Sequence, residues 1–253
     1  YGMILGTGPT GSGKTVSLYT GLNILNTDER NISTCEDPVE MRVPGINQVE
    51  VKHNIGLNFQ RIIRAMLRQA PNIILVGEIR DMETAEIAIK AAQTGHMVLS
   101  TLHTNDAPSA ITRLLDLGVP GYLIKSTLIG VVAQRLLRRL CPHCKKETEI
   151  DARRWAEVSG GSALLPKPDT VFVPVGCLEC RETGYLGRVG IYEIMPMSKT
   201  LNAVIGVDAD LILLREQALK EGMMPLRIAG CVKVAAGATS VEEVLGVAAG
   251  SGG

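Results

Sequence analysis

The octapeptide Gly-Pro-Thr-Gly-Ser-Gly-Lys-Thr at residues 8–15 restricts the fold of this chain more than any other feature. It matches the pattern G-x-x-x-x-G-K-[ST] in full, with a short apolar run before it and helical spacing after it. A strand, a glycine-rich turn and a helix in this order direct backbone N–H groups and a helix N-terminus at an anion. We therefore predict a phosphate-binding turn made of Gly8, Pro9, Thr10, Gly11, Ser12, Gly13, Lys14 and Thr15.

Two side chains at the end of this turn match what a bound nucleoside triphosphate requires. Lys14 would reach the β and γ phosphates, and the hydroxyl of Thr15 would ligate Mg²⁺. A carboxylate at the end of a neighbouring strand commonly binds the same ion, either directly or through one of its water ligands. Glu78 ends the apolar run of residues 72–78, so we predict that it serves the Mg²⁺, although an acidic residue at a strand end is also common on surfaces.

Further polar residues follow or flank predicted strands. Glu36, Asp37 and Glu40 come just past a strand end, where an acid could activate water, although a solvated acidic turn would have the same composition. His96 and His103 bracket a buried strand and are candidate sensors of the γ-phosphate. Their spacing of seven places them on opposite faces of a regular strand.

Apolar runs alternate with helical patterns through residues 3–117, which predicts an α/β fold with a mostly parallel sheet covered by helices. After residue 120 the pattern predicts mainly helices, including a basic helical segment over residues 135–154. We expect three parts, namely a core over 1–134, a cysteine-containing insert over 135–190 and a helical subdomain over 191–253.

Four of the six cysteines form two C-x-x-C pairs, Cys141/Cys144 and Cys177/Cys180. Two such pairs separated by a loop are typical of a tetrahedral four-thiolate zinc site. The insert is too short to build a core of its own, so we predict that zinc fastens it. Four free thiols are the alternative.

The sequence argues against a nucleic-acid-binding surface and against a membrane-spanning helix. Basic and acidic residues are equal in number, 26 each, and aromatic residues make up only 3% of the chain, so a nucleic-acid surface is not expected. No apolar run approaches the roughly 20 residues that cross a bilayer.

Taken together, these motifs resemble the family of ATPases of type II secretion and type IV pilus assembly. The resemblance rests on GPTGSGKT, TCEDPVE, LVGEIRD, AAQTGHMVLSTLHTNDA, the four cysteines and GRVGIYEIM, and it covers nearly the whole chain. The cysteine insert and two stretches, PGINQVEV and AEIAIKAAQTGHMVLSTLHTN, favour the branch that extends pili.

The resemblance implies a RecA-like core that hydrolyses ATP to ADP, with the site residues taking family roles. Glu40 would activate water with Glu36 nearby, Glu78 would serve the metal, His96 and His103 would act around the γ-phosphate, and Arg188 would reach nucleotide within the ring. It also implies a homo-hexamer, cytoplasmic and peripheral to the inner membrane, whose insert contacts the inner-membrane platform protein. The chain, which opens on Tyr1, would be the catalytic half of a longer protein.

Three alternatives stay open. The first is a motor for the pseudopilus of type II secretion. The second is a DNA-translocating RecA-like motor, which the basic stretch and the cysteine pairs favour weakly. The third is a module that binds ATP without hydrolysing it.

Overall fold

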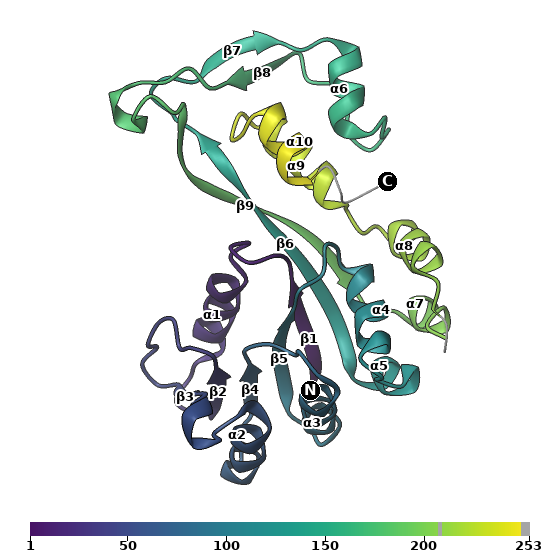
Figure 1. Cartoon of the computed structure of the whole chain (residues 1–253). Helices are drawn as coiled ribbons and strands as arrows, with labels where there is room; N and C mark the ends of the chain where they lie inside the picture. The colour runs from purple at the N-terminus through teal and green to yellow at the C-terminus, as the bar shows by residue number, and fades with distance from the viewer. Residues whose placement is uncertain (207–208, 249–253) are drawn as a thin grey trace. The chain divides into compact units, whose positions relative to one another are not determined.

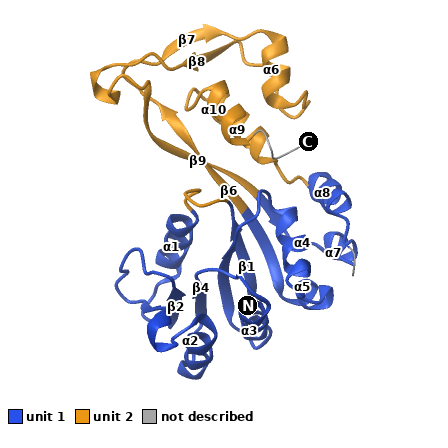
Figure 2. Cartoon of the chain, viewed as in Figure 1, with its two compact units in different colours: residues 1–8, 14–132, 194–221 blue, residues 9–13, 133–193, 222–253 orange. Residues whose placement is uncertain are grey.

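The computed structural model describes residues 1–206 and 209–248 (Figure 1). Its contacts divide the chain into two compact units, which we call unit 1 and unit 2 (Figure 2). Unit 1 comprises residues 1–8, 14–132 and 194–221, and unit 2 comprises residues 9–13, 133–193 and 222–253. Residues 207–208 and 249–253 lie outside the described part of the chain.

Unit 1 alternates strands with helices, as the sequence predicts. Its strands lie in one sheet in the order β3-β2-β4-β5-β1-β6-β9, and the first four neighbouring pairs in this order are parallel. Its elements before the last two strands are β1 (Gly2–Thr7), α1 (Lys14–Leu25), β2 (Ile32–Glu36), β3 (Asn47–Glu50), α2 (Phe59–Met66), β4 (Ile73–Val76), α3 (Met82–Gln93), β5 (Met97–Leu102), α4 (Pro108–Asp116) and α5 (Gly121–Thr127). Two helices late in the chain, α7 (Lys199–Ala203) and α8 (Leu211–Lys220), also belong to unit 1.

Helices cover both faces of this sheet because its strands are apolar on both sides. Every residue of β4 is buried. On one face, Tyr19 and Leu22 of α1 pack with a cluster that includes Ile32 of β2. The next residue along β2, Ser33, faces the other way toward α2. Helices α2 and α3 also contact each other.

Two long strands, β6 (Leu128–Leu140) and β9 (Tyr185–Pro196), begin or end in unit 1 and continue into unit 2. The other elements of unit 2 are β7 (Lys146–Glu149), α6 (Ala152–Ser159), β8 (Thr170–Val173), a short 3₁₀ helix (Leu178–Cys180), α9 (Leu226–Ala235) and α10 (Val241–Ala248). Strands β7 and β8 form an antiparallel pair, and the three helices pack together.

The prediction of helices after residue 120 is wrong for much of this region. Helix α5 ends at Thr127, and the chain then forms the 13-residue strand β6. Apolar residues are so dense in 128–137 that they satisfy the helical and the strand period equally, and pairing with β1 and β9 decides between them. The segment 135–154, predicted as a basic helix, contains the end of β6, the strand β7 and only the start of α6.

The predicted α/β class with a mostly parallel sheet is confirmed. The three-part division at residues 134 and 190 stays a prediction, because the contact-based units interleave along the chain and cut it elsewhere. Within residues 1–206 and 209–248, no helix combines the length and apolarity that crossing a membrane requires.

Candidate functional site

Most candidate residues of unit 1 follow the carboxyl ends of parallel strands. Thr7 at the end of β1 pairs with Leu102 of β5, and Val76 at the end of β4 pairs with Cys35 of β2. The chain therefore leaves these four strands at one edge of the sheet, which is where ligands bind in open α/β folds. The candidates that follow at this edge, which we call the carboxyl edge, are Lys14, Thr15, Glu36, Glu40, Glu78 and His103.

The turn of residues 9–13 has the backbone that its sequence predicts. Gly11 and Gly13 have φ values of 79° and 86°, which L side chains rarely adopt. A Cβ atom on Gly13 would also lie only 2.8 Å from Nε2 of Gln134. Ser12 is 3% exposed, and its Oγ has no hydrogen-bond partner among the described residues. A buried hydroxyl donor in a glycine turn fits an anionic ligand such as phosphate.

Lys14 and Thr15 begin helix α1 and are held by oxygen atoms of unit 1. Lys14 Nζ donates a 2.7 Å hydrogen bond to the carbonyl oxygen of Gly8. Thr15 Oγ1 donates to Oε1 of Glu40 over 3.2 Å. The structure thus brings the predicted metal-ligating hydroxyl together with the predicted water-activating acid.

Two glutamates of residues 36–40, which we call the acidic stretch, lie in different environments. Glu36 is buried and accepts hydrogen bonds from the hydroxyls of Tyr19 and Thr34 and from Nε2 of Gln48. Burial, followed by the bond to Glu36, raises the pKa of Tyr19 far above its ordinary value. Glu40 is exposed. Glu36 is therefore held by its neighbours, whereas Glu40 is open to water.

Glu78 lies between a cation and a histidine. Its Oε1 contacts Nη2 of Arg80 at 2.5 Å, and its Oε2 lies 3.5 Å from Nε2 of His103. The hydrogen bond to Glu78 raises the pKa of Arg80. The side chain of Glu78 is only 13% exposed, so these two neighbours dominate its surroundings.

Sequence reasoning missed Arg80 and Tyr19. Arg80 stands two residues after Glu78 in the same stretch, and a carboxylate near a cation within one motif is a signal that could have been used. Tyr19 gives a weaker signal, because only the packing of α1 on β2 shows that its hydroxyl reaches Glu36.

Two predicted residues do not join the carboxyl edge. His96 precedes β5 and lies at the amino edge of the sheet, where its Nδ1 is 2.9 Å from the carbonyl oxygen of Ala91. Arg188 lies on β9 in unit 2 and is exposed. His96 therefore stands at the opposite edge of the sheet from the carboxylates, and Arg188 belongs to the other unit.

The four cysteines predicted as a metal site come together in unit 2. Their sulfur atoms lie within 4.8 Å of one another, with 3.9 Å between Cys141 and Cys177, 3.8 Å between Cys144 and Cys180, and 3.7 Å between Cys177 and Cys180. A tetrahedral ion with metal–sulfur bonds of about 2.3 Å places its sulfurs about 3.8 Å apart. The cluster therefore fits Zn²⁺ in the distances between its ligand atoms.

Backbone N–H groups around this cluster favour thiolates. The N–H groups of Gly176, Cys177 and Gly184 donate to cysteine sulfurs over 3.2–3.3 Å. Burial raises the pKa of Cys180, but the hydrogen bonds from Cys177 and Gly184 outweigh it and lower the pKa to about 6. Lys145, the residue after Cys144, donates to the carbonyl oxygen of Gly237 and lies over the ring of Phe172.

Comparison with known proteins gives consistent matches along the chain. The family model for "Type II/IV secretion system protein" matches residues 1–246. The chain is 53% identical over 247 residues to the type IV pilus assembly ATPase TfpB of Acinetobacter baylyi and 54% identical over 248 residues to the type IV pilus assembly ATPase PilB of Pseudomonas aeruginosa. It is 47% identical over 249 residues to the type II secretion system protein E of Klebsiella pneumoniae. These matches cover 98%, 96% and 98% of the chain but only 42%, 43% and 48% of the relatives, so the chain spans less than half of their length.

A solved structure of the pilus retraction motor PilT with bound ADP shares the fold. It matches with a TM-score of 0.70 and 28% identity, covering 97% of this chain and 61% of that one. The likeness extends over both units, which agrees with the RecA-like α/β class predicted from the sequence.

Proposed function

The chain belongs to the type II/IV secretion system protein family, and we propose that it hydrolyses ATP to drive the assembly of type IV pili. The observation that carries the pilus assignment is the higher identity to pilus assembly ATPases, 53–54%, than to a type II secretion protein, 47%. Assembly of a type II secretion pseudopilus is the second candidate function, supported by the latter relative.

The proposed site uses the residues of the carboxyl edge in distinct roles. Residues 8–15 would bind the triphosphate of ATP through backbone N–H groups and Lys14, and Thr15 would hold Mg²⁺ with Glu78 near it. Bound Mg²⁺ would neutralise charge on the phosphate oxygens. Glu40 would orient the attacking water and accept its proton, since it is exposed and already contacts Thr15. Glu36 would hold the acidic stretch in place.

Charged groups around Glu78 suggest how the site responds to its ligand. Arg80 and His103 both contact Glu78, so a metal ion near this carboxylate would compete with them. We propose that His103 then turns toward the γ-phosphate. His96 could contact the nucleotide only after leaving its position at the amino edge of the sheet. Arg188 could contact it only from unit 2 or from another subunit.

The remaining proposals concern the assembly. A homo-hexamer would supply arginine residues such as Arg188 to nucleotide, as the family resemblance implies. The cluster Cys141, Cys144, Cys177 and Cys180 would bind one structural Zn²⁺. The insert that it fastens would contact the inner-membrane platform protein, on the cytoplasmic face of that membrane. No nucleic acid is expected as a partner.

Phosphate release by the assembled protein tests the proposed activity. We expect Lys14→Ala to lower the rate at least 100-fold, because the lysine supplies charge that stabilises the transferred phosphoryl group. Lys90→Ala is the matched control, since Lys90 is exposed and pairs with Glu86 on the surface of α3. An unchanged rate in Lys14→Ala would refute hydrolysis at this turn. Tight ATP binding without phosphate release in the unmodified protein would instead indicate a binding module.

A further inference from the structure

Thr7 lies between the residue proposed to bind phosphate and the histidine proposed to respond to it. It is the last residue of β1 and is fully buried. The residue after it, Gly8, accepts the hydrogen bond from Lys14. Across the sheet, Thr7 forms the last pair of the β1–β5 ladder with Leu102, so His103 stands one residue beyond the ladder.

The hydroxyl of Thr7 extends this attachment past the end of the ladder. Its Oγ1 accepts the backbone N–H of Thr104 over 2.9 Å and lies 3.2 Å from the carbonyl oxygen of Leu102. These two backbone groups flank His103 in the chain. One side-chain oxygen of β1 therefore contacts the backbone on both sides of the histidine.

The protons of this contact can be assigned one by one. Thr7 has a single hydroxyl proton to donate, and the nearest acceptor is Oγ1 of Thr104 at 2.6 Å. Thr104 Oγ1 in turn donates to the carbonyl oxygen of Asp106 over 3.0 Å. Because the N–H of Thr104 donates back to Thr7, each of the two threonines is both donor and acceptor for the other.

The far end of residues 103–106 is held by Asp106, which is 4% exposed. Its Oδ1 accepts from the backbone N–H of Ser109 in the first turn of α4, and its Oδ2 lies 2.6 Å from Nη2 of Arg215 on α8. The His103 side chain, by contrast, is 50% exposed and is 3.5 Å from Glu78. The segment thus combines a backbone fixed at both ends with a ring that has room to turn.

We propose that Thr7 is a positioning residue for His103, with Thr104 as its hydrogen-bonding partner. The inference rests on the proposed ATP hydrolysis, in which the His103 ring turns from Glu78 toward the γ-phosphate. Such a ring needs a fixed backbone, because an error of about 1 Å in position can cost roughly 100-fold in rate. The Thr7 hydroxyl supplies this by attaching the histidine to the strand that leads into the phosphate-binding turn.

Two substitutions separate the hydroxyl of Thr7 from its shape. In the assembled protein, Thr7→Val should lower kcat about tenfold and leave KM for ATP within about twofold, because the phosphate-binding residues are unchanged. Thr7→Ser keeps the hydroxyl and should return kcat to within about twofold of the unmodified protein. Phosphate release at varied ATP concentration gives both constants. Equal values of kcat in Thr7→Val and the unmodified protein overturn the proposal, as does a change confined to KM.

A double-mutant cycle tests whether Thr7 acts through the histidine. In the His103→Ala background, Thr7→Val should cause a further loss of kcat no larger than about twofold, because there is no ring left to position. Losses that multiply would show that Thr7 acts independently of His103 and would overturn the proposal. An unchanged kcat in His103→Ala alone would overturn it as well.

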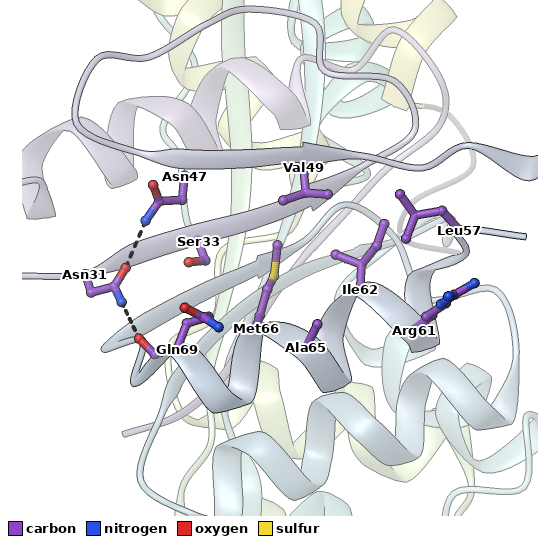
Figure 3. A pocket seen from close by; sticks show the side chains of 10 residues that line it. All are labelled: Asn31, Ser33, Asn47, Val49, Leu57, Arg61, Ile62, Ala65, Met66 and Gln69. Atoms are coloured by element: carbon purple, nitrogen blue, oxygen red, sulfur yellow. Dashed lines mark hydrogen bonds between the residues drawn. The ribbon is translucent and has the colours of Figure 1, made fainter. Parts of the chain in front are cut away.

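Two control variants remove side-chain hydrogen bonds elsewhere in unit 1. Thr127 is 3% exposed, and its hydroxyl donates to the carbonyl oxygen of Leu123 over 2.7 Å. At the amino edge of the sheet, Asn47 Nδ2 donates to Asn31 Oδ1 over 3.2 Å (Figure 3). Thr127→Val and Asn47→Ala should keep kcat within about twofold. A loss in either that equals the loss in Thr7→Val would indicate a general effect on stability and count against positioning.

Amide hydrogen exchange examines the same contact without catalysis. In the ligand-free protein, Thr7→Val should speed exchange about tenfold in peptides covering residues 103–107, because the Thr104 N–H loses its acceptor. Thr7→Ser should leave that exchange unchanged. Equal exchange in Thr7→Val and the unmodified protein overturns the proposal even if the protein hydrolyses ATP. Absence of phosphate release from the unmodified protein would instead refute the proposed function, so the two failures are distinguishable.

Discussion

The cysteine cluster of unit 2 and the carboxyl edge of unit 1 are both built from charged or ionisable groups, but they are held in different ways. Three of the sulfur–sulfur distances already match a tetrahedral zinc site, and the sulfurs of Cys144, Cys177 and Cys180 receive backbone hydrogen bonds. At the carboxyl edge, Lys14, Thr15 and Glu78 are occupied by other protein groups that a ligand would replace. The first arrangement suits a permanent ion, and the second suits a ligand that comes and goes.

The largest expected effect is the loss of bound zinc from the cysteine cluster. Cys177→Ser should reduce the zinc content from one ion per chain to nearly none, because a structural four-thiolate site needs all of its ligands. Atomic emission of the purified chain measures this directly. Cys231→Ser is the control, since Cys231 lies in the same unit but outside the cluster, and it should keep its zinc. If both variants retain the metal, the cluster is not its site.

A smaller effect should separate the exposed acid of the carboxyl edge from the buried one. Glu40→Gln should lower kcat by about 100-fold, the low end of what a general base contributes, because the amide cannot accept a proton from water. Its unfolding free energy should stay near that of the unmodified chain, because Glu40 is exposed. Phosphate release and urea titration give the two values. An unchanged kcat would remove Glu40 from the proposed mechanism.

The smallest effect is a loss of stability at Glu36. Glu36→Gln should lower the free energy of unfolding by about 1–3 kcal/mol, because a neutral amide replaces a buried carboxylate that three donors contact. Glu86→Gln is the control, as its surface pair with Lys90 contributes little. Urea unfolding monitored by circular dichroism compares them. Equal stabilities would mean that Glu36 does not anchor the acidic stretch.

The same two regions differ in how far the sequence predicts them. The cysteine cluster is predicted from spacing, because each C-x-x-C pair is local and two such pairs supply the four ligands of one metal ion. The strands of the carboxyl edge follow from apolar runs such as residues 73–76, and parallel pairing then places Glu78 and His103 together. Contacts that depend on helix packing, such as Tyr19 with Glu36, leave no comparable pattern in the sequence.

The role of His96 stays a prediction, but the structure separates it from His103. The two histidines flank one strand at its two ends, and only His103 stands at the carboxyl edge. The strand β6 was predicted as a helix because its apolar residues fit both periods. For β6 the deciding information is which strands lie alongside, and local sequence does not contain it.

Gly13 shows how firmly the phosphate-binding turn is specified. Its backbone angle of 86° excludes most side chains, and independently the space beside it is taken by Gln134. Shortening Gln134 would open room for a methyl group at position 13 without making that angle any easier for alanine. Second-site suppressors at position 134 should therefore fail to rescue a substituted Gly13, which leaves reversion to glycine as the simple genetic route back.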